Sequence, residues 1–205
     1  MQFELILASA SPRRRELLER AGVAFRVHAV DVDESLEPDD LAQPAEAVKK
    51  LAERKAHAAV EELLVGGYEG SMIVLGSDTM VALGAEVFGK PGNRDEAERM
   101  LRSLSGRTHQ VHTGVSVWMV YAPAGEDISL GFRSFTDTSD VTFRAIGDAE
   151  LEAYLATDEP YDKAGAYAVQ GTAGSFVERV DGALDTVIGL PVERLLREFP
   201  DIPRK

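Results

Sequence analysis

Two serines and three arginines near the amino terminus have side chains that bind anions. They form the segment SASPRRR at 9–15, in which Ser11 and Pro12 are typical of a helix start. The first N–H groups of a helix have no intrahelical partner and carry the positive end of its dipole. Arginine also offers a planar fork of donors that matches phosphate oxygens. We therefore predict an anion site here, with a capped helix and solvated arginines as the alternative.

A polar segment with a single carboxylate follows the apolar run 72–75. It reads Gly76-Ser77-Asp78-Thr79. The apolar run is expected to be a buried strand that ends at this segment, and open α/β sheets often bind ligands beside the carboxyl ends of their strands. An aspartate there can act as a general base on water or hold a divalent cation. The alternative is an aspartate that only caps a turn.

Lys55 lies on the apolar face of a predicted helix. Apolar residues between 44 and 65 recur at helical spacing, and Lys55 falls on the same face as Val48, Leu51 and Ala59. Lysine is rarely buried without a partner, because taking an ammonium group out of water is costly. It either extends past the edge of the core or faces a cleft that holds anions. We favour the cleft.

Two glycine-containing segments carry further lysines. The loop FGKPG at 88–92 fixes Lys90 between glycine and proline, but it lacks the Gly-Lys-Ser/Thr ending of a P-loop. The segment 159–171 contains Lys163 and is rich in polar residues and glycine. It can close over a ligand, and its Gln170 offers both a hydrogen-bond donor and an acceptor. A long surface loop is the alternative.

Several kinds of chemistry are excluded by the residue types present. The chain has no cysteine, so disulfides, thiolate zinc sites and cysteine nucleophiles are excluded. The G-x-S-x-G and H-E-x-x-H motifs are absent, which argues against a serine hydrolase or a zinc protease. His109 and His112 lie three apart on a predicted strand, so they point to opposite faces and cannot share one metal. Trp118 is interpreted as a core residue.

An alternation of strands and helices must position these candidates. Strands are expected at 3–8, 25–30, 72–75 continuing through 80–83, 86–88, 111–121, 129–143 and 175–180, and helices at 13–21, 44–65, after Asn93, from Asp148 to about Thr157, and from Pro191 to before Pro200. Segments 31–40 and 159–174 are expected to be loops. The mixture predicts an α/β or α+β fold with long antiparallel strands in its middle. The length of 205 residues fits a single domain, 1–205, which can have two lobes.

The charge balance limits the partners. A formal net charge of −13 would repel nucleic acid and anionic lipid over most of the surface, so neither is expected as a partner. A bound polyanion would need a local cluster of arginine and lysine. Apolar stretches such as 115–120 are too short to span a bilayer, and no signal-peptide pattern is present. Together with the absence of cysteine, this predicts a cytoplasmic protein.

Taken in order, the candidate segments resemble the Maf family of nucleotide pyrophosphatases. The matching blocks are LASASPRR at 7–14 followed by ELL at 16–18, SDT at 77–79, GKP at 89–91, LSGRTHQV at 104–111, and the segment 159–171 with FV at 176–177 and IGLP at 188–191. They cover nearly the whole chain. The resemblance implies an α/β fold with two lobes, a central mixed sheet, flanking helices and a deep cleft. It also implies an architecture similar to that of inosine-triphosphate pyrophosphatases, and a homodimer.

The resemblance also implies an activity and a set of roles. Members of the family cut nucleoside triphosphates between the α and β phosphates, with Mg²⁺ or Mn²⁺. The proton-accepting aspartate of the family falls on Asp78, and its specificity positions fall on Arg13, Thr79 and Gln170. The sequence DKAGAY at 162–167 with Gln170 looks like members that act on dTTP and UTP. Members that act on 7-methyl-GTP have Cys after that aspartate and Glu near the glutamine position.

These roles predict how the triphosphate would be held. Glu34 and Asp78 are the expected metal ligands, and whether Asp78 acts mainly as base or as ligand stays open. Further contacts to the phosphates are expected from Ser9, Ser11, Arg14, Lys55, Lys90 and Lys163. Two other functions remain as alternatives: a nucleotide-binding regulator of septum formation without catalysis, and a pyrophosphatase for 7-methyl-GTP.

Overall fold

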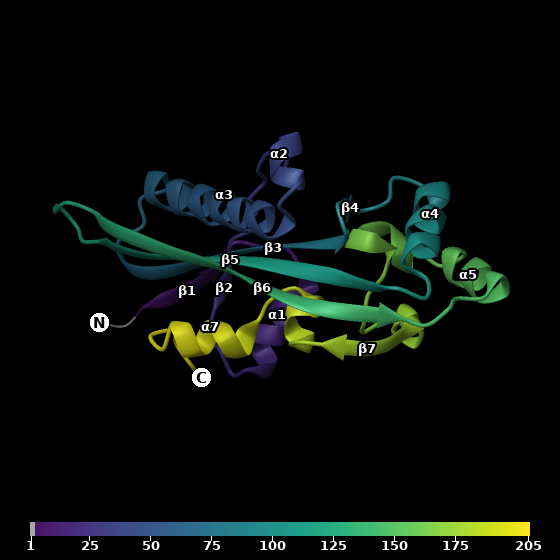
Figure 1. Cartoon of the computed structure of the whole chain (residues 1–205). Coiled ribbons are helices and arrows are strands. Elements are labelled where there is room, and N and C mark those ends of the chain that lie inside the picture. The colour runs from purple at the N-terminus through teal and green to yellow at the C-terminus, as the bar shows by residue number, and fades with distance from the viewer. Residues whose placement is uncertain (1–2) are drawn as a thin grey trace.

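The computed structural model describes residues 3–205 and shows one curved, mixed sheet with helices on both faces (Figure 1). The strands follow the order β2-β1-β3-β5-β6-β7, and β4 adds to the far end of β3. Their bounds are β1 (Glu4–Leu7), β2 (Arg26–Val27), β3 (Gly70–Leu83), β4 (Glu86–Phe88), β5 (Thr108–Ala122), β6 (Ser129–Phe143) and β7 (Val177–Asp181). The β1–β2 and β1–β3 pairs are parallel, and the other pairs are antiparallel. The predicted mixed α/β class with long antiparallel central strands is confirmed.

Helices cover both faces of the sheet. They are α1 (Pro12–Arg20), α2 (Pro38–Leu41), α3 (Pro44–Val65), α4 (Arg94–Leu104), α5 (Asp148–Leu155), α6 (Leu184–Ile188) and α7 (Val192–Glu198). Helix α3 runs along one face, whereas α1 and α7 lie on the opposite face (Figure 1). The Asn93 side chain accepts a hydrogen bond from the Glu96 N–H at 2.9 Å and caps α4, as the sequence predicts. Among residues 3–205, no helix is long and apolar enough to cross a bilayer.

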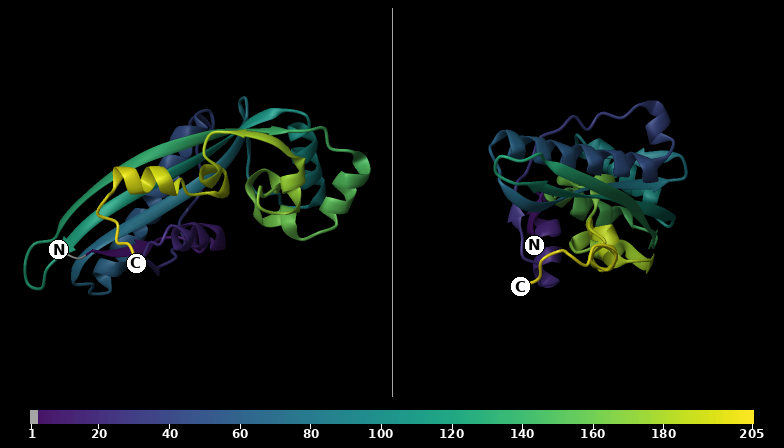
Figure 2. Two further views of the ribbon diagram at one scale, coloured as in Figure 1. Left: turned by 90° about the horizontal axis from the view of Figure 1, so that it is seen from below. Right: turned by 90° about the vertical axis from the view of Figure 1, so that its left-hand side faces the viewer.

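Two lobes share the three long strands. In the first lobe, α1 and α7 pack on one face of the sheet around Leu75, while α3 packs on the other face around Val74. In the second lobe, α4, α5 and the segment 159–176 pack around Val81 and Phe143. Strands β3, β5 and β6 contribute side chains to the cores of both lobes. The left-hand view of Figure 2 shows the sheet bending as it passes from one lobe to the other.

Some expected elements differ in extent from those observed. The strand predicted at 25–30 is reduced to Arg26–Val27, because only these residues pair with β1 before the chain leaves the sheet edge. The segment 159–174 is not a plain loop, since it contains 3-10 turns at Glu159–Asp162, Ala164–Ala166 and Thr172–Phe176. Helices α2 and α6 were not predicted from the sequence, because four and five residues are too few to show a helical period.

The predicted continuation of the apolar strand through 80–83 is confirmed, and only the interpretation of Asp78 as lying at a strand end is wrong. Strand β3 continues to Leu83, because β5 pairs with it without interruption from Gly70 to Ala82. What ends near this point is the neighbouring strand β1, whose last residue pairs with Leu75. Strand β4 joins the same edge of β3 only at Val81. Within residues 3–205, the edge of β3 between these two partners is therefore open, and Asp78 lies on this open stretch.

Candidate active site

A cleft of about 1230 Å³ lies beside the open edge of β3. Its walls come from the turn between β1 and α1, from α3 and β3, from the loop after β4, and from the segment 162–170. Every residue for which the sequence predicts a role lines this cleft: Ser9, Ser11, Arg13, Arg14, Glu34, Lys55, Asp78, Thr79, Lys90, Lys163 and Gln170. The fold thus brings these distant segments together, while their individual roles stay predictions.

An ammonium group between two carboxylates forms the most polar contact in the cleft. The Lys55 Nζ lies 2.5 Å from Asp78 Oδ1 and 2.7 Å from Glu34 Oε1. The side chains of Lys55 and Asp78 are only 12% and 13% exposed, whereas that of Glu34 is 57% exposed. Lys55 therefore faces the cleft and its anions, and it does not extend past the core to water. The Coulomb attraction within a pair this shielded from water is screened less than that of a surface pair.

Two glycines allow α3 to approach the sheet closely enough for this contact. A Cβ atom on Gly76 would lie 2.2 Å from the Ala52 carbonyl oxygen, and one on Gly114 would lie 2.3 Å from the Val48 carbonyl oxygen. Any side chain at either position would push α3 away from β3 and β5. Because Lys55 is one turn beyond Ala52, such a shift would also move its ammonium group away from Asp78.

The two carboxylates are suitable ligands for a hard divalent cation. Burial raises the pKa of Glu34, but its hydrogen bond and ion pair with Lys55 outweigh this effect, so the pKa lies below its usual value. Glu34 is therefore ionised at neutral pH. Its carboxylate and that of Asp78 both contact the Lys55 ammonium, and oxygen donors of this kind also bind Mg²⁺ and Mn²⁺. No group of three or more potential metal ligands occurs in the described residues, so phosphate or water oxygens would complete the coordination.

Arg14 connects three parts of the cleft wall. Its guanidinium donates hydrogen bonds to the Gly189 carbonyl at 2.9 Å, to Ser9 Oγ at 3.1 Å and to Thr79 Oγ1 at 3.4 Å. Burial lowers the pKa of Arg14, and the nearby Asp78 carboxylate opposes this shift. The group stays charged because arginine titrates far above neutral pH. Its bonds to the protein hold it in one orientation beside the phosphate site predicted from the sequence.

The start of α1 faces the cleft without a side-chain cap. Ser11 occupies the cap position, but its hydroxyl makes no capping hydrogen bond, contrary to the interpretation of Ser11 as a good cap. The Ser11 N–H is instead donated to Ser9 Oγ at 3.2 Å. The chain therefore leaves the first N–H groups of α1 for another acceptor, which is the arrangement expected of an anion site.

The opposite wall consists of two loops that are joined to each other. The Gly165 N–H donates to the Gly89 carbonyl at 3.1 Å, so the turn before Lys90 holds the turn after Lys163. Gly165 has a φ of +68°, and a Cβ atom there would lie 3.1 Å from the Val81 side chain. Glycine adopts this conformation without strain, whereas a side chain here would be strained and would crowd Val81. The Lys163 Nζ donates to the Glu159 carbonyl at 2.8 Å and pairs with the Asp162 carboxylate.

Glu159 holds the end of this segment next to Gln170. Its carboxylate accepts the Thr172 N–H at 3.0 Å and the Ala173 N–H at 3.4 Å. It also accepts the Tyr154 hydroxyl at 3.3 Å. Gly171 packs against this carboxylate so closely that an added Cβ atom would lie 2.0 Å from Glu159 Oε1. Glu159 therefore fixes the backbone on which Gln170 stands.

His109 connects the second lobe to the cleft. It is 1% exposed, and its Nε2 lies 2.8 Å from the hydroxyl of Tyr167, which lines the cleft. Its Nδ1 has no hydrogen-bond partner among the described residues, and burial lowers the pKa of His109 from 6.5 to about 4. The imidazole is therefore neutral at pH 7. His112, the second histidine of β5, contacts Thr138, so each of these two histidines has its own partner.

Reasoning from the sequence missed two residues that support the cleft, Glu159 and Thr113. Glu159 falls inside the predicted loop, but nothing in the local pattern shows that it contacts the backbone at 172–173. Thr113 is fully buried opposite Thr79 on the neighbouring strand. Only the register of β3 with β5 reveals this pairing, since 34 residues separate the two threonines in the chain.

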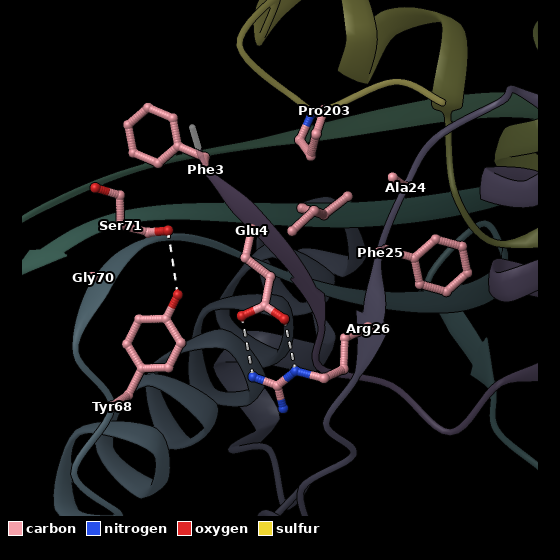
Figure 3. Close-up of a pocket in the computed structure, with 10 residues that line it drawn as sticks. Phe3, Glu4, Ala24, Phe25, Arg26, Tyr68, Gly70, Ser71 and Pro203 are labelled. Carbon is pink, nitrogen blue, oxygen red and sulfur yellow. Dashed lines mark hydrogen bonds and ion pairs between the residues drawn. The ribbon is translucent and has the colours of Figure 1, made fainter. Parts of the chain in front are cut away.

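A second hollow, of about 510 Å³, lies near the amino-terminal end of the sheet. Figure 3 shows that its polar side chains face each other: Arg26 forms two hydrogen bonds with Glu4, at 2.9 and 3.4 Å. The Tyr68 hydroxyl donates to the Ser71 carbonyl at 3.3 Å. These groups already have partners within the protein, and the hollow lies away from the carboxylates and cations of the cleft. The cleft is therefore the candidate active site.

A mixed α/β fold whose cleft combines clustered cations with paired carboxylates defines a protein suited to a phosphate-bearing ligand. The chain belongs to the Maf family, since the family model described as Maf-like protein matches residues 4–202. The resemblance noted in the sequence is thereby confirmed.

Relatives with high identity carry one name. A protein of Hahella chejuensis named dTTP/UTP pyrophosphatase is 43% identical over 198 residues, which cover 95% of this chain and 92% of the relative. A protein of Bacillus cereus with the same name is 40% identical over 196 residues, with 96% and 94% covered. Among solved structures, the Staphylococcus aureus Ham1 protein aligns with 97% of this chain and 98% of its own at 14% identity, with a TM-score of 0.41. This distant likeness adds nothing to the family assignment.

Proposed function

We propose that the chain is a nucleoside-triphosphate pyrophosphatase that hydrolyses dTTP and UTP to the monophosphate and pyrophosphate. The observation that carries the proposal is the carboxylate, ammonium and carboxylate cluster of Asp78, Lys55 and Glu34 at the wall of a large cleft. The names of the relatives that are 40–43% identical support the choice of substrates. A cleft that only bound a nucleotide would not need a shielded carboxylate beside the phosphates.

In the proposed reaction, water attacks the α-phosphorus and the bond from this phosphorus to the oxygen that bridges it to the β-phosphorus breaks. Asp78 accepts a proton from the attacking water, and pyrophosphate leaves with the electron pair of the broken bond. The ammonium of Lys55 contacts the Asp78 carboxylate and holds it in its orientation. The positive groups of Arg13, Lys90 and Lys163 offset the charge that develops on the phosphate oxygens, and the open start of α1 supplies N–H donors.

A divalent cation is part of the proposal. Glu34 and Asp78 would hold Mg²⁺ or Mn²⁺, which would neutralise charge on the phosphates and polarise their oxygens. Hydrolysis should therefore stop in excess chelator and return when either ion is added back. Full activity in excess chelator would contradict this part of the proposal.

The base would be read mainly by Gln170, which stands on the opposite wall of the cleft from Asp78. The exposed Gln170 amide can donate to a carbonyl oxygen and accept from a ring N–H of uracil or thymine. Arg13 and Thr79 also line the cleft and are proposed to contribute to specificity. A site built for this hydrogen-bonding edge would reject bases that present the reverse pattern.

The decisive experiment measures pyrophosphate release from a panel of triphosphates, with identification of both products. We expect release from dTTP and UTP, and slower release from the other members of the panel. The panel contains 7-methyl-GTP, so preferential hydrolysis of that nucleotide would support the alternative pyrophosphatase. Binding without release from any member would support a regulator that lacks catalysis.

The proposal also includes the domain organisation, the oligomeric state and the location of the enzyme. We propose that the two lobes of residues 1–205 act as one domain and that two copies associate as a homodimer. We also propose a cytoplasmic location and no nucleic-acid partner, since a net charge of −13 disfavours binding of polyanions outside the cationic cleft. The oligomeric state can be measured by analytical ultracentrifugation.

A further inference from the structure

A buried threonine opposite Thr79 controls the hydrogen of the Thr79 hydroxyl. Thr113 lies directly across from Thr79 in the β3–β5 pairing, and their hydroxyl oxygens are 2.9 Å apart. The Thr113 Oγ1 is also 2.7 Å from the carbonyl oxygen of Thr186. Thr113 and Thr186 are both fully buried, so water does not compete for these bonds.

Counting hydrogens assigns a direction to each bond. A carbonyl oxygen can only accept, so Thr113 must donate its single hydroxyl hydrogen to Thr186. In the contact between the two hydroxyls, Thr79 is therefore the donor and Thr113 the acceptor. The Arg14 guanidinium carries only donors, and its Nη2 lies 3.4 Å from Thr79 Oγ1, where it takes one lone pair. A single lone pair of Thr79 remains.

The acceptor that starts this chain of bonds is itself held in place. The Thr186 hydroxyl donates to Asp137 Oδ2 at 2.6 Å, and the Thr186 N–H donates to Asp185 Oδ1 at 2.9 Å. Arg194 in turn donates to Asp137 Oδ1 at 2.8 Å. The Thr186 carbonyl cannot turn away without breaking these contacts. The hydrogen of Thr113, and through it that of Thr79, is therefore fixed by groups outside the cleft.

We propose that Thr113 is a positioning residue that leaves Thr79 able only to accept, so that the cleft selects a substrate group that donates a hydrogen bond there. The inference rests on the proposed function, because it requires that Thr79, which lines the cleft, contacts the nucleotide. In dTTP and UTP, the donors common to both are the ring N–H of the base and the 3′-hydroxyl of the sugar. Cytosine has no hydrogen on the corresponding ring nitrogen.

The test compares Thr113→Val with Thr113→Ser. Valine keeps the shape of threonine and removes the hydroxyl, so the Thr79 hydrogen becomes free to point into the cleft. The kcat/KM of each variant is measured for UTP, CTP, dTTP and 3′-fluoro-dTTP, whose 3′ group cannot donate. In Thr113→Val, a roughly tenfold fall in the UTP to CTP ratio places the contact at the base. A similar fall in the dTTP to 3′-fluoro-dTTP ratio places it at the sugar. Thr113→Ser should keep the wild-type ratios.

A double variant shows whether the change acts through Thr79. Thr79→Val combined with Thr113→Val has no hydroxyl to redirect. Any rise in kcat/KM for CTP or the fluoro analogue that Thr113→Val produces should therefore disappear. Thermal unfolding identifies variants that fold, and Thr113→Ala replaces Thr113→Val if the latter does not. An equal loss for all four nucleotides, or the same change of ratio in Thr113→Ser, would overturn the inference. Wild-type protein that releases pyrophosphate from none of them would instead overturn the proposed function.

Discussion

The two walls of the cleft are held in different ways. The first wall is formed by α3, β3 and the start of α1, and the second by the loop after β4 and the segment 162–170. On the first wall, Arg14 makes three hydrogen bonds to the protein, and Lys55 is held between two carboxylates. These side chains stand on a helix packed against the sheet or on the helix start that follows β1. On the second wall, Lys90 and Gln170 are exposed and stand on turns that contain glycine.

The held groups of the first wall and the exposed groups of the second wall suit two different tasks. Charge stabilisation in a reaction is most effective when its groups are oriented in advance, which the first wall provides. Reading a base needs contacts that form around the ligand, and loops anchored at a few points allow this. We therefore expect changes to Asp78 and Lys55 on the first wall to affect turnover, and changes that move Gln170 on the second wall to affect recognition of the nucleotide.

The largest effect is expected from Asp78→Asn on the first wall. The amide keeps the size of the side chain but cannot accept the proton from water, so kcat should fall about 10²- to 10⁴-fold. Nucleotide affinity, measured by calorimetry, should remain largely unchanged, as should the thermal unfolding temperature. Unchanged turnover would remove Asp78 from its proposed role.

Gln170→Glu on the second wall should change selectivity. A glutamate ionised at neutral pH donates no hydrogen bond, so kcat/KM for dTTP and UTP should fall about 10- to 100-fold. Nucleotides that do not depend on this donor should lose much less. Steady-state kinetics on the triphosphate panel would measure the effect, and an equal loss for every nucleotide would show that Gln170 does not read the base.

Gly171→Ala tests whether Glu159 positions Gln170. The added Cβ atom would lie 2.0 Å from Glu159 Oε1, so the carboxylate must release the backbone N–H groups that it binds. We expect KM for dTTP to rise by up to about tenfold, with kcat little changed. Gly125→Ala, at a turn where an added Cβ meets nothing within 4 Å, is the matched control, although its positive φ lowers stability slightly. A fall in kcat with unchanged KM would contradict this role.

His109→Gln should alter the pH dependence of stability and leave activity at neutral pH nearly unchanged. Burial lowers the pKa of His109 to about 4, so between pH 6.5 and pH 4 the unfolded chain binds this proton more readily than the folded protein. Stability is therefore complete above about pH 6.5 and falls as the pH decreases. At pH 5 the wild-type protein should have lost about 2 kcal/mol of its free energy of unfolding for this reason. The variant lacks the imidazole and should not show this loss. Urea unfolding at pH 7.5 and pH 5 measures it; equal losses in variant and wild type would contradict it.

The walls also differ in how much of them the sequence predicts. Helix α3 was predicted with its observed bounds, because its apolar stripe spans six turns, and the same stripe placed Lys55 correctly. The 3-10 turns of the second wall have no such period, so Glu159 and its contacts were not predicted. The strand was expected to continue from 72–75 through 80–83, but Asp78 was interpreted as lying at a strand end because Gly76 and Ser77 interrupt the apolar run. The pairing with β5, which is distant in sequence, carries the strand through them.

The passage of β3, β5 and β6 through both lobes has a mechanical consequence. Opening the cleft by swinging one lobe away from the other would require three neighbouring strands to bend together and strain their shared hydrogen bonds. The two lobes are therefore expected to behave as one rigid body and not to rotate about a hinge. Entry of the nucleotide and escape of pyrophosphate must depend on small movements of the turns around Lys90 and Lys163, and loss of either half should unfold the other in a single cooperative step.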